Sequence, residues 1–486
     1  MGQDCDSAFK RKIEYGDFQT PIELAEKICC KLVDLGIEPD IIIEPTCGIG
    51  NFIKAAANTF QSANQVIGID INYDYINKIK QERFFLQDTR ITIHQADFFQ
   101  FNWSSLVQEA QGHILIIGNL PWVTNSKQGK IQGDNLPLKT NFKKYSALEA
   151  ITGKSNFDIS EWMLIQIINH LQQYQASIAV LCKTSVARKL LSYIHSQKLY
   201  LDYCASYKID AKRYFAANVD ACLLFCTVKP NSQNYFCDVF NNLDEGEFYQ
   251  IGYHASLLVK DIDKFNSVKD LYDPKPSKKW RSGIKHDCSD IMEFHKIQDG
   301  YINGLGEIID LEETYIFPLI KGSDVAQGRI ENSNRYVLVT QRLIGEPTDK
   351  LKDLAPKTWK YLEHHAPYLD NRKSKIYKTT PCFSIFGVGE YTFSPWKIAI
   401  CGLYKKLSFR LVGTIENKPT IFDDTVYFLS FDNEEAANQA FTHLTSPLAT
   451  DFYSSLIFWD EKRPIKTSIL NCLNLSALAK RLSVNC

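Results

Sequence analysis

Short apolar runs alternate with longer amphipathic stretches through the first half of the chain. The apolar runs are typical of buried strands. The stretches between them space their apolar residues three and four positions apart, which is typical of helices that cover a sheet. We expect strands near residues 41–43, 66–70, 91–99 (with its turn), 114–117, 177–182, 203–209 and 221–228. We expect helices over residues 22–35, 53–60, 160–171 and 187–196.

Strands and helices that alternate in this way specify a three-layer α/β fold built on a mostly parallel sheet. In such sheets, ligands bind outside the carboxyl ends of the strands. Polar residues stand at four of the predicted strand ends, at Glu44, Asp70, Asp97 and Asn119. The pattern therefore predicts one ligand site that these four loops form together.

The second half of the chain is mixed α/β in pattern and has no nucleotide-binding loop. It contains a predicted strand at 335–341, a charged helical region at 349–371 and a strand-like run at 422–428. We expect three parts in the whole chain. They are a catalytic domain at 1–245, a junction at 246–285 and a second domain at 286–486.

Composition narrows the class of protein. The chain has 486 residues, 45% of them hydrophobic and 23% charged, as in globular proteins of two or three domains. The net charge is −1, with 24 basic and 24 acidic residues in positions 1–240, so a nucleic-acid surface requires local clusters. No run resembles a membrane span or a signal segment, so we expect a cytoplasmic protein with no membrane partner. The fourteen cysteines show no C-x-x-C pairs, so we expect buried thiols and no metal.

The first candidate ligand loop, residues 44–52, lies directly between a predicted strand and a predicted helix. The acidic Glu44 stands near a G-x-G sequence, Gly48 to Gly50. Glycines at such a turn let the backbone approach a nucleotide closely. The third glycine of the dinucleotide fingerprint is missing, which argues against NAD.

Three further polar positions extend this candidate site. Thr20 is the expected N-cap of a helix that starts at Pro21, and a helix N-terminus also offers free N–H groups to a ligand. Asp70 ends the second strand, where a carboxylate accepts hydrogen bonds from ribose hydroxyls; a solvated strand end is the alternative. Asp97 either binds an adenine amino group, with Phe98 or Phe99 covering the ring, or caps a turn with both aromatics in the core. We favour a ligand for both aspartates, and the roles of Phe98 and Phe99 stay open.

The fourth loop, Asn-Leu-Pro-Trp at 119–122, follows a long apolar run. Pro121 fixes the backbone and has no N–H, so the loop cannot continue the sheet. Asn119 and Trp122 offer an amide and a flat ring, which suit the edge and face of a nucleobase. Taken alone, the stretch favours a turn with the indole in the core, but the loops upstream favour the base. The polar segment 123–155 is either a flap over the substrate or a surface insertion.

Five motifs, taken in order, are similar to those of a known family. They are Gly16-Asp17-Phe18-Gln19-Thr20-Pro21, Glu44-Pro45-Thr46-Cys47-Gly48-Ile49-Gly50, Gly68-Ile69-Asp70, Ala96-Asp97-Phe98-Phe99 and Asn119-Leu120-Pro121-Trp122. With them, the first half of the chain resembles the gamma-class amino-methyltransferases of DNA, the TaqI-type adenine-N6 enzymes of bacterial restriction–modification systems. No single motif is specific, whereas the five in this order are.

The resemblance implies an S-adenosylmethionine-dependent methyltransferase fold, a seven-stranded, mostly parallel sheet with helices on both faces. It implies transfer of a methyl group from S-adenosylmethionine to N6 of an adenine flipped out of double-stranded DNA. It places the catalytic loop at Asn119, Leu120, Pro121 and Trp122, and a second aromatic contact of the base at Phe215. It places cofactor contacts at Thr20, Glu44, Pro45, Cys47, Gly48, Gly50, Asp70, Ile71, Asp97, Phe98 and Asn119.

Leu120 departs from the family, which has proline at this position. In the family, the target amino group donates hydrogen bonds to the Asn side chain and to the main-chain carbonyl of the next residue. A leucine keeps that carbonyl, so the chemistry can survive the change. The same Asn-Leu-Pro-aromatic form also occurs in ribosomal-RNA adenine dimethyltransferases, so an RNA substrate is the alternative.

The second half resembles, more weakly, the target-recognition region of the same enzymes. Two acid-free basic runs are expected to contact DNA phosphates, or else to be solvated linkers. Their candidate contacts are Lys278, Lys279, Arg281, Arg372, Lys373 and Lys375. No P-loop and no nuclease motif is seen, so a cognate restriction endonuclease would be encoded separately. Besides a DNA enzyme, an RNA or protein methyltransferase and a catalytically silent binding protein remain alternatives.

Overall fold

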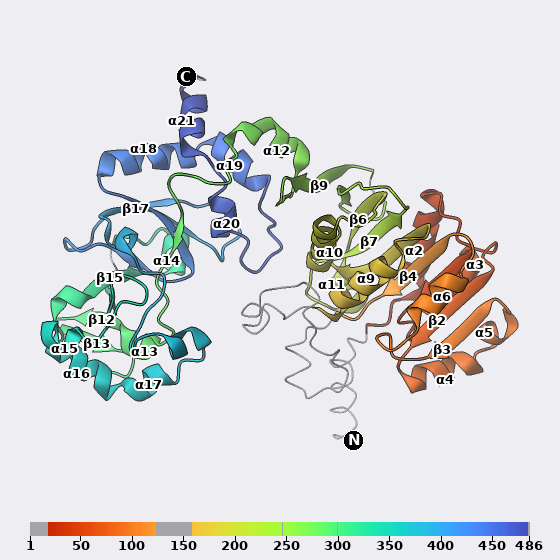
Figure 1. Cartoon of the computed structure of the whole chain (residues 1–486), viewed down its shortest axis with the longest axis horizontal. Helices are drawn as coiled ribbons and strands as arrows, with labels where there is room; N and C mark the ends of the chain where they lie inside the picture. Colours follow the sequence, from red (N-terminus) through yellow and green to blue (C-terminus); the bar gives the residue numbers. More distant parts are fainter. Residues whose placement is uncertain (1–17, 123–157, 245, 299, 332, 485–486) are drawn as a thin grey trace. The chain divides into compact units, whose positions relative to one another are not determined.

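A computed structural model describes residues 18–122, 158–244, 246–298, 300–331 and 333–484, which form two compact units (Figure 1). Unit 1 ends at Ile262, and unit 2 begins at Asp263. The expected flap at 123–155 and the first two residues of the Gly16-to-Pro21 motif lie outside the described residues. None of the described helices is both long and apolar enough to cross a membrane.

Unit 1 is built on one ten-stranded sheet with the order β10-β9-β8-β6-β7-β5-β4-β1-β2-β3. The strands from β3 to β5 in this order run parallel, and β7 is antiparallel to both of its neighbours. The strands are β1 (Ile41–Glu44), β2 (Gln65–Asp70), β3 (Ile91–Gln95), β4 (Ile114–Asn119), β5 (Ala176–Lys183), β6 (Tyr203–Ile209), β7 (Ala221–Val228), β8 (Cys237–Phe240), β9 (Phe248–His254) and β10 (Leu257–Val259).

Helices cover both faces of this sheet (Figure 1). One group, which includes α2 and α3, shares a hydrophobic core with apolar residues of β1, β4 and β7. Helix α9 packs against α6 and α10. The described helices of unit 1 are α2 (Ile22–Asp34), α3 (Asn51–Thr59), α4 (Tyr73–Gln81), α5 (Arg83–Gln87), α6 (Trp103–Glu109), α9 (Ile159–His170), α10 (Thr184–Gln197) and α11 (Ala211–Phe215).

The expected methyltransferase architecture is confirmed, and three details of the sequence prediction are wrong. The predicted seven strands form the sheet from β6 to β3, but β8, β9 and β10 extend it to ten. The region 246–285 is no separate junction, because β9 and β10 pair within the unit 1 sheet and the rest belongs to unit 2. The N-cap of α2 is Pro21, and Thr20 makes no capping hydrogen bond.

Unit 2 contains two further sheets. The six-stranded sheet has the order β14-β13-β12-β16-β15-β19, and the four-stranded sheet has the order β11-β20-β17-β18. The predicted strand at 422–428 is in fact two, separated by a bridge residue at 423 and a turn at 424–425. The strands are β11 (Arg281–Ser282), β12 (Glu293–Ile297), β13 (Gly300–Asn303), β14 (Ile308–Ile309), β15 (Ile316–Ile320), β16 (Arg335–Leu338), β17 (Trp396–Cys401), β18 (Arg410–Val412), β19 (Ile421–Phe422) and β20 (Val426–Phe431).

Short helices surround the two sheets of unit 2, and the charged region 349–371 is helical as expected. Its core gathers Ile, Leu, Val and aromatic residues of both the strands and these helices. The helices are α12 (Ile262–Val268), α13 (Ser289–Met292), α14 (Gly322–Gln327), α15 (Leu351–Leu354), α16 (Pro356–His364), α17 (Ala366–Asp370), α18 (Glu434–Leu444), α19 (Pro447–Ser454), α20 (Thr467–Leu470) and α21 (Leu475–Val484).

One lysine lies inside the core of unit 2. The side chain of Lys397, on β17, is 1% exposed. Its Nζ donates hydrogen bonds to the carbonyls of Ser394 at 2.7 Å and Thr420 at 2.9 Å. A neutral amine has two N–H donors, so these two carbonyls satisfy it completely. Burial lowers the pKa of Lys397 to about 7, because the charged form loses its hydration.

We predict that Lys397→Met removes a pH-dependent part of the stability of unit 2. The folded pKa of about 7 lies below the ordinary 10.5, so between these values the unfolded chain binds more protons. Stability should therefore rise with pH across this window, by at most about 1.4 kcal/mol per pH unit for one proton. Urea unfolding of the two proteins at several pH values measures the difference. Parallel pH profiles for the wild type and the variant would contradict a neutral buried amine.

Candidate active site

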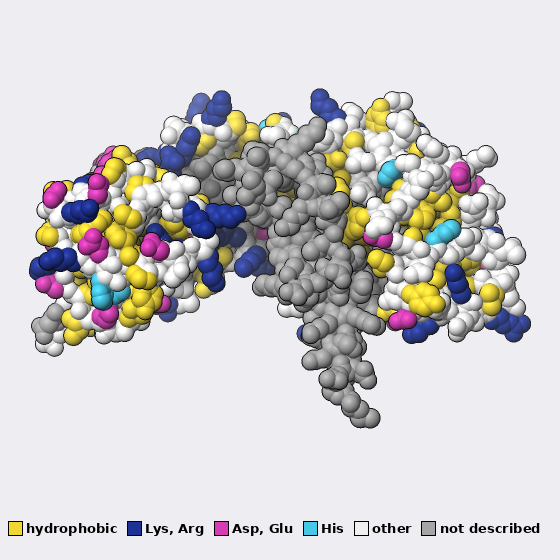
Figure 2. Space-filling view, turned by 60° about the horizontal axis from the view of Figure 1, so that its bottom comes forward, with side chains coloured by type: hydrophobic (Ala, Val, Ile, Leu, Met, Phe, Trp, Pro, Cys, Tyr) yellow, Lys and Arg dark blue, Asp and Glu magenta, His cyan; other side chains and the backbone are white. Residues whose placement is uncertain are grey.

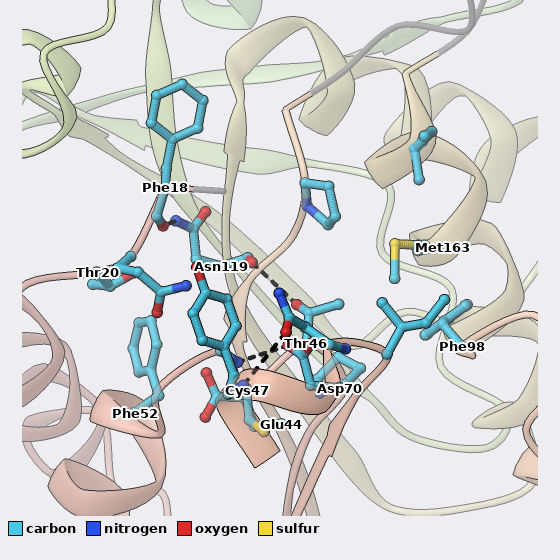
Figure 3. Close-up of a pocket in the computed structure, with 18 of the residues that line it drawn as sticks. Phe18, Thr20, Glu44, Thr46, Cys47, Phe52, Asp70, Phe98, Asn119 and Met163 are labelled. Atoms are coloured by element: carbon cyan, nitrogen blue, oxygen red, sulfur yellow. Dashed lines mark hydrogen bonds between the residues drawn. The ribbon is translucent and has the colours of Figure 1, made fainter. Parts of the chain in front are cut away.

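The candidate site is a cleft of about 890 Å³ at the carboxyl ends of β1, β2 and β4. Its lining comes from all four loops that the sequence singled out, together with the segment before α2 and the first turns of α9 (Figure 3). Eleven of the predicted site residues line it. They are Thr20, Glu44, Pro45, Cys47, Gly48, Asp70, Ile71, Asp97, Phe98, Asn119 and Pro121.

The loop between β1 and α3 is shaped by two glycines and by main-chain hydrogen bonds. Gly48 and Gly50 have φ values of +53° and +82°, which side chains other than glycine rarely adopt. The Cys47 N–H donates to the Ile69 carbonyl at 2.8 Å, which ties the loop to β2. The Gly48 N–H donates to Asp70 Oδ2 at 2.7 Å. An added side chain would meet Gln19 at Gly48 and Phe85 at Gly50, so both glycines let these neighbours pack closely on the loop. Gly48 lines the cleft, whereas Gly50 does not.

Glu44 is a carboxyl group almost without solvent. It is 3% exposed at the end of β1. Burial raises its pKa well above the ordinary value, and the nearby charge of Asp70 raises it further. A neutral Glu44 can accept a hydrogen bond, and an ionised one is stabilised by donors that a ligand brings into the cleft.

Three buried polar atoms of the lining have no hydrogen-bond partner in the described part of the chain. They are Thr20 Oγ1, Glu44 Oε2 and Asn119 Oδ1 (Figure 3). Leaving a buried polar atom unpaired costs about 1–3 kcal/mol each, so folded proteins keep few of them. All three are acceptors or can act as acceptors. Together they fit a ligand that carries several hydrogen-bond donors.

Asn119 is held at its side chain and at its main chain. The side-chain Nδ2 donates to the Phe18 carbonyl at 2.9 Å, and the main-chain carbonyl of Asn119 accepts from Thr46 Oγ1 at 3.1 Å. The opposite amide orientation would set Oδ1 against the Phe18 carbonyl, two acceptors in contact. The hydrogen bond thus fixes Oδ1 as the atom that remains available as an acceptor. Leu120 is buried, at 1% exposed, so its side chain serves the core.

The two aspartates of the lining already have partners. Asp70 accepts hydrogen bonds from the N–H groups of Gly48 and Asn72 at 2.7 and 2.8 Å. Asp97 accepts from the Phe99 N–H at 2.9 Å, as in the turn-capping alternative, while it also lines the cleft. A carboxylate can accept about four hydrogen bonds, so neither contact excludes a ligand.

Trp122 and Phe215 lie beside the cleft and do not line it. Trp122 is 6% exposed, and its ring centre is 5.0 Å from that of Phe215 and 5.6 Å from that of Phe18. Its Nε1 donates to the Leu181 carbonyl at 3.5 Å. The three rings form one cluster, which we call the aromatic cluster, and Phe18 is its member at the cleft.

The basic candidates of unit 2 divide into exposed and buried residues. Arg372 is buried, at 9% exposed, and its guanidinium donates to the carbonyls of Leu369, His286 and Ser384, so it is a structural residue of the core. Lys278 is exposed, although its Nζ donates to the Ser430 carbonyl. The remaining candidates are exposed: Lys279, Arg281, Lys373 and Lys375.

Sequence reasoning missed several lining residues that support others. Thr46 fixes the main chain at Asn119, and Gln19 Oε1 accepts from the Ile49 N–H at 3.1 Å. Both belong to the motifs already noted, but their partners are far away in sequence. Met163 of α9 closes another side of the cleft. Helical spacing predicted α9 but gave no sign that this face meets the loops.

No family model matches the chain. A type II methyltransferase, M.NspV of Nostoc sp. (strain ATCC 29411 / PCC 7524), is 63% identical to it over 471 residues. The match covers 97% of this chain and 98% of that protein. It therefore includes the cleft of unit 1 and nearly all of unit 2.

Among solved structures, the type IIL restriction-modification enzyme MmeI in complex with DNA has a similar fold. The TM-score is 0.52 at 12% identity, over 92% of this chain. This chain spans 64% of the length of that protein. The identity of 63% to the Nostoc protein, across both units, shows that the chain belongs to the type II methyltransferases.

Proposed function

We propose that this methyltransferase transfers a methyl group from S-adenosylmethionine to the exocyclic N6 of an adenine flipped out of double-stranded DNA. Its relationship to a type II methyltransferase supports the methyl transfer and the cofactor. The adenine target rests on the motifs around Asn119. We further propose that the protein is the modification enzyme of a restriction–modification system, with a separate endonuclease as its functional counterpart.

The observation that carries this proposal is the buried, unpartnered Oδ1 of Asn119 at the end of β4. An exocyclic amine conjugated with a purine ring is a poor nucleophile. Acceptors that hold its hydrogens localise the nitrogen lone pair in the direction of transfer. Asn119 Oδ1 and the Leu120 carbonyl would be these two acceptors. Their contribution is positioning and electrostatic stabilisation rather than covalent catalysis.

The rest of the cleft fits the cofactor. The buried acceptors Thr20 Oγ1 and Glu44 Oε2 suit its hydroxyl and ammonium donors, and Asp70 stands where ribose hydroxyls are expected. The loop that carries Gly48 lines the cleft beside Asp70, where a nucleoside is expected. Bound S-adenosylmethionine supplies an electrophilic methyl group on a sulfonium. Asp97 and Phe98 line the part of the cleft that suits an adenine ring.

The aromatic cluster supplies the face for the extruded base. Flipping a base costs a few kcal/mol, and stacking on an aromatic ring returns about 1–3 kcal/mol. Phe18 reaches the cleft, with Trp122 and Phe215 packed behind it. We infer that the flipped base stacks on the ring of Trp122 after the Phe18 side chain has moved aside.

Unit 2 is the proposed target-recognition domain. On the face seen in Figure 2, Lys and Arg side chains gather toward the upper and right part of this unit, whereas acidic side chains lie mostly to the left. The exposed candidates for phosphate contacts are Lys278, Lys279, Arg281, Lys373 and Lys375. Arg372 is withdrawn from this set because its guanidinium binds core carbonyls.

The substrate class is tested by transfer of a labelled methyl group to duplex DNA, RNA and protein. We expect label in DNA, and N6-methyladenine as the product in nucleoside mass spectrometry. Label in RNA alone would support the alternative that Leu120 raises. N4-methylcytosine would leave DNA as the substrate but contradict the adenine target, since cytosine also carries an exocyclic amine.

Asn119→Ala should lower the rate of transfer about a hundred- to thousandfold, because one positioned acceptor of the amine is lost. The variant should still bind S-adenosylmethionine, measured by calorimetry. Asn169→Ala, at an exposed position on α9, is the matched control and should transfer at the wild-type rate. Undiminished transfer by Asn119→Ala would show that the catalytic assignment is wrong.

Cofactor affinity should depend on pH through Glu44. Its raised pKa favours the protonated carboxyl in the free enzyme, whereas donors of the cofactor favour the ionised form. Binding then releases a proton wherever the free carboxyl is protonated, so affinity should rise with pH up to the raised pKa of Glu44, by at most about tenfold per pH unit. Calorimetry in buffers of different ionisation enthalpy counts the proton. Glu44→Gln should bind more weakly and with a flatter pH profile; an unchanged profile would contradict this role.

The double variant Lys373→Gln/Lys375→Gln should weaken DNA binding without unfolding unit 2, because both side chains are exposed. The slope of log affinity against log salt should fall by about one per lysine removed. Lys357→Gln is the control, since Asp310 already neutralises this exposed lysine at 2.6 Å. Equal salt slopes for all three proteins would exclude this basic run from the DNA interface.

A further inference from the structure

A second cluster of chemically active side chains lies in unit 2, in a different unit from the cleft. Glu307, His364 and His365 bring one ligand atom each to within 4.8 Å of one another. Glu307 lies at the end of the turn between β13 and β14. His364 is the last residue of α16, and His365 is its C-cap. Nothing in the methyl-transfer chemistry uses these residues.

The ring of His365 faces acceptors on both sides. It is 4% exposed, its Nδ1 lies 2.8 Å from the Tyr361 carbonyl, and its Nε2 lies 2.8 Å from Glu307 Oε2. A neutral imidazole carries one N–H. When Nδ1–H donates to the carbonyl, the lone pair of Nε2 points at a carboxylate oxygen. A cation placed between Nε2 and Glu307 would satisfy both acceptors.

The surroundings fix the orientation of both groups. Asn303 Nδ2 donates to Glu307 Oε2 at 2.7 Å and to the Tyr361 hydroxyl at 3.0 Å. Asn303 Oδ1 accepts from the N–H groups of Leu305 and Glu307 at 3.0 Å, which holds the turn. A histidine whose second nitrogen donates to a main-chain carbonyl, beside an oriented carboxylate, has the outer partners typical of metal ligands.

His364 completes the set from the solvent side. Its ring is exposed and stands edge-on to His365, with ring centres 4.9 Å apart. Two imidazoles and one carboxylate are a zinc-binding combination that leaves a fourth position for water. The cluster also stands at the C-terminus of α16, where the helix dipole favours a cation.

We propose that Glu307, His364 and His365 form a Zn²⁺ site that fastens the β13–β14 turn to the end of α16. The metal ion would stand between His365 Nε2 and Glu307, and any proton held there would be released to solvent. Zn–N and Zn–O bonds of about 2.1 Å in tetrahedral geometry need about 3.4 Å between the two ligand atoms. The present 2.8 Å contact thus has to open only slightly. The site is independent of the proposed methyl transfer.

The test is a titration of the whole, chelator-stripped protein with Zn²⁺ against a chromophoric chelator, with the metal counted by mass spectrometry. We expect one tightly held Zn²⁺ per chain. His364→Asn and Glu307→Gln should each weaken binding at least tenfold. His295→Asn, which removes an exposed histidine of β12 outside the cluster, should bind as the wild type does.

Thermal unfolding separates loss of the site from loss of the fold. Zn²⁺ should raise the melting temperature of the wild type and of His295→Asn, and leave the other two variants unchanged. In EDTA, all four proteins should melt at similar temperatures, because His364 is exposed and the amide that Glu307→Gln introduces can still contact Asn303. Zinc binding no tighter in the wild type than in His364→Asn would overturn the proposal, and the pair Glu307–His365 would then share only a proton.

Discussion

The hydrogen bond from Asn119 Nδ2 to the Phe18 carbonyl, 2.9 Å long, sets the polarity of the cleft. It joins the end of β4 to the segment before α2, two parts of the chain that the sequence separates by about a hundred residues. Because it turns the Nδ2 side of the amide toward Phe18, Oδ1 remains available to the cleft as an acceptor. Thr46 Oγ1 donates to the main-chain carbonyl of Asn119, so the backbone that carries the amide is also fixed. The proposed chemistry needs this arrangement before any substrate arrives.

This preorganisation lowers the free energy of unfolding, because it leaves buried polar atoms unpaired. Thr20, Glu44 and Asn119 each keep a buried polar atom unpaired, at about 1–3 kcal/mol apiece. The strands beneath them are almost wholly buried and aliphatic, as in Ile41–Glu44 and Ile114–Asn119. A rigid apolar sheet can hold strained polar loops at its edge, where a flexible surface would let them find partners. A ligand with several donors restores the missing hydrogen bonds and is bound more tightly for that reason.

The architecture of unit 1 and the members of its cleft were predictable because both follow from local patterns. Buried parallel strands read as apolar runs, and their carboxyl ends meet at one edge, so the loops at Glu44, Asp70, Asp97 and Asn119 had to converge. Contacts between distant segments left no such pattern. The partners of Thr46 and Gln19, and the extension of the sheet by β9 and β10, are properties of the three-dimensional packing alone.

Residue type also failed to predict burial for side chains that occur both in protein cores and at binding surfaces. Trp122 suits a base or a core, and the structure puts it in the aromatic cluster behind Phe18. Arg372 and Lys373 are neighbours in one basic run, yet only Arg372 turns inward to three carbonyls. A run of basic residues indicates that a segment is positively charged. Which of its side chains are exposed depends on whether hydrogen-bond acceptors lie near each position.

The same accounting of donors and acceptors separates structural polar groups from candidate ligand sites. The buried neutral amine of Lys397 has two N–H donors, and two main-chain carbonyls accept from them, so neither donor is left unpaired. Arg372 is satisfied in the same way. Asn119 Oδ1 has no hydrogen-bond partner among the described residues, and both ring nitrogens of His365 face acceptors. Burial alone marks all four residues as unusual; only the last two have a mismatch that a ligand can resolve, a donor-bearing amine in one case and a cation in the other.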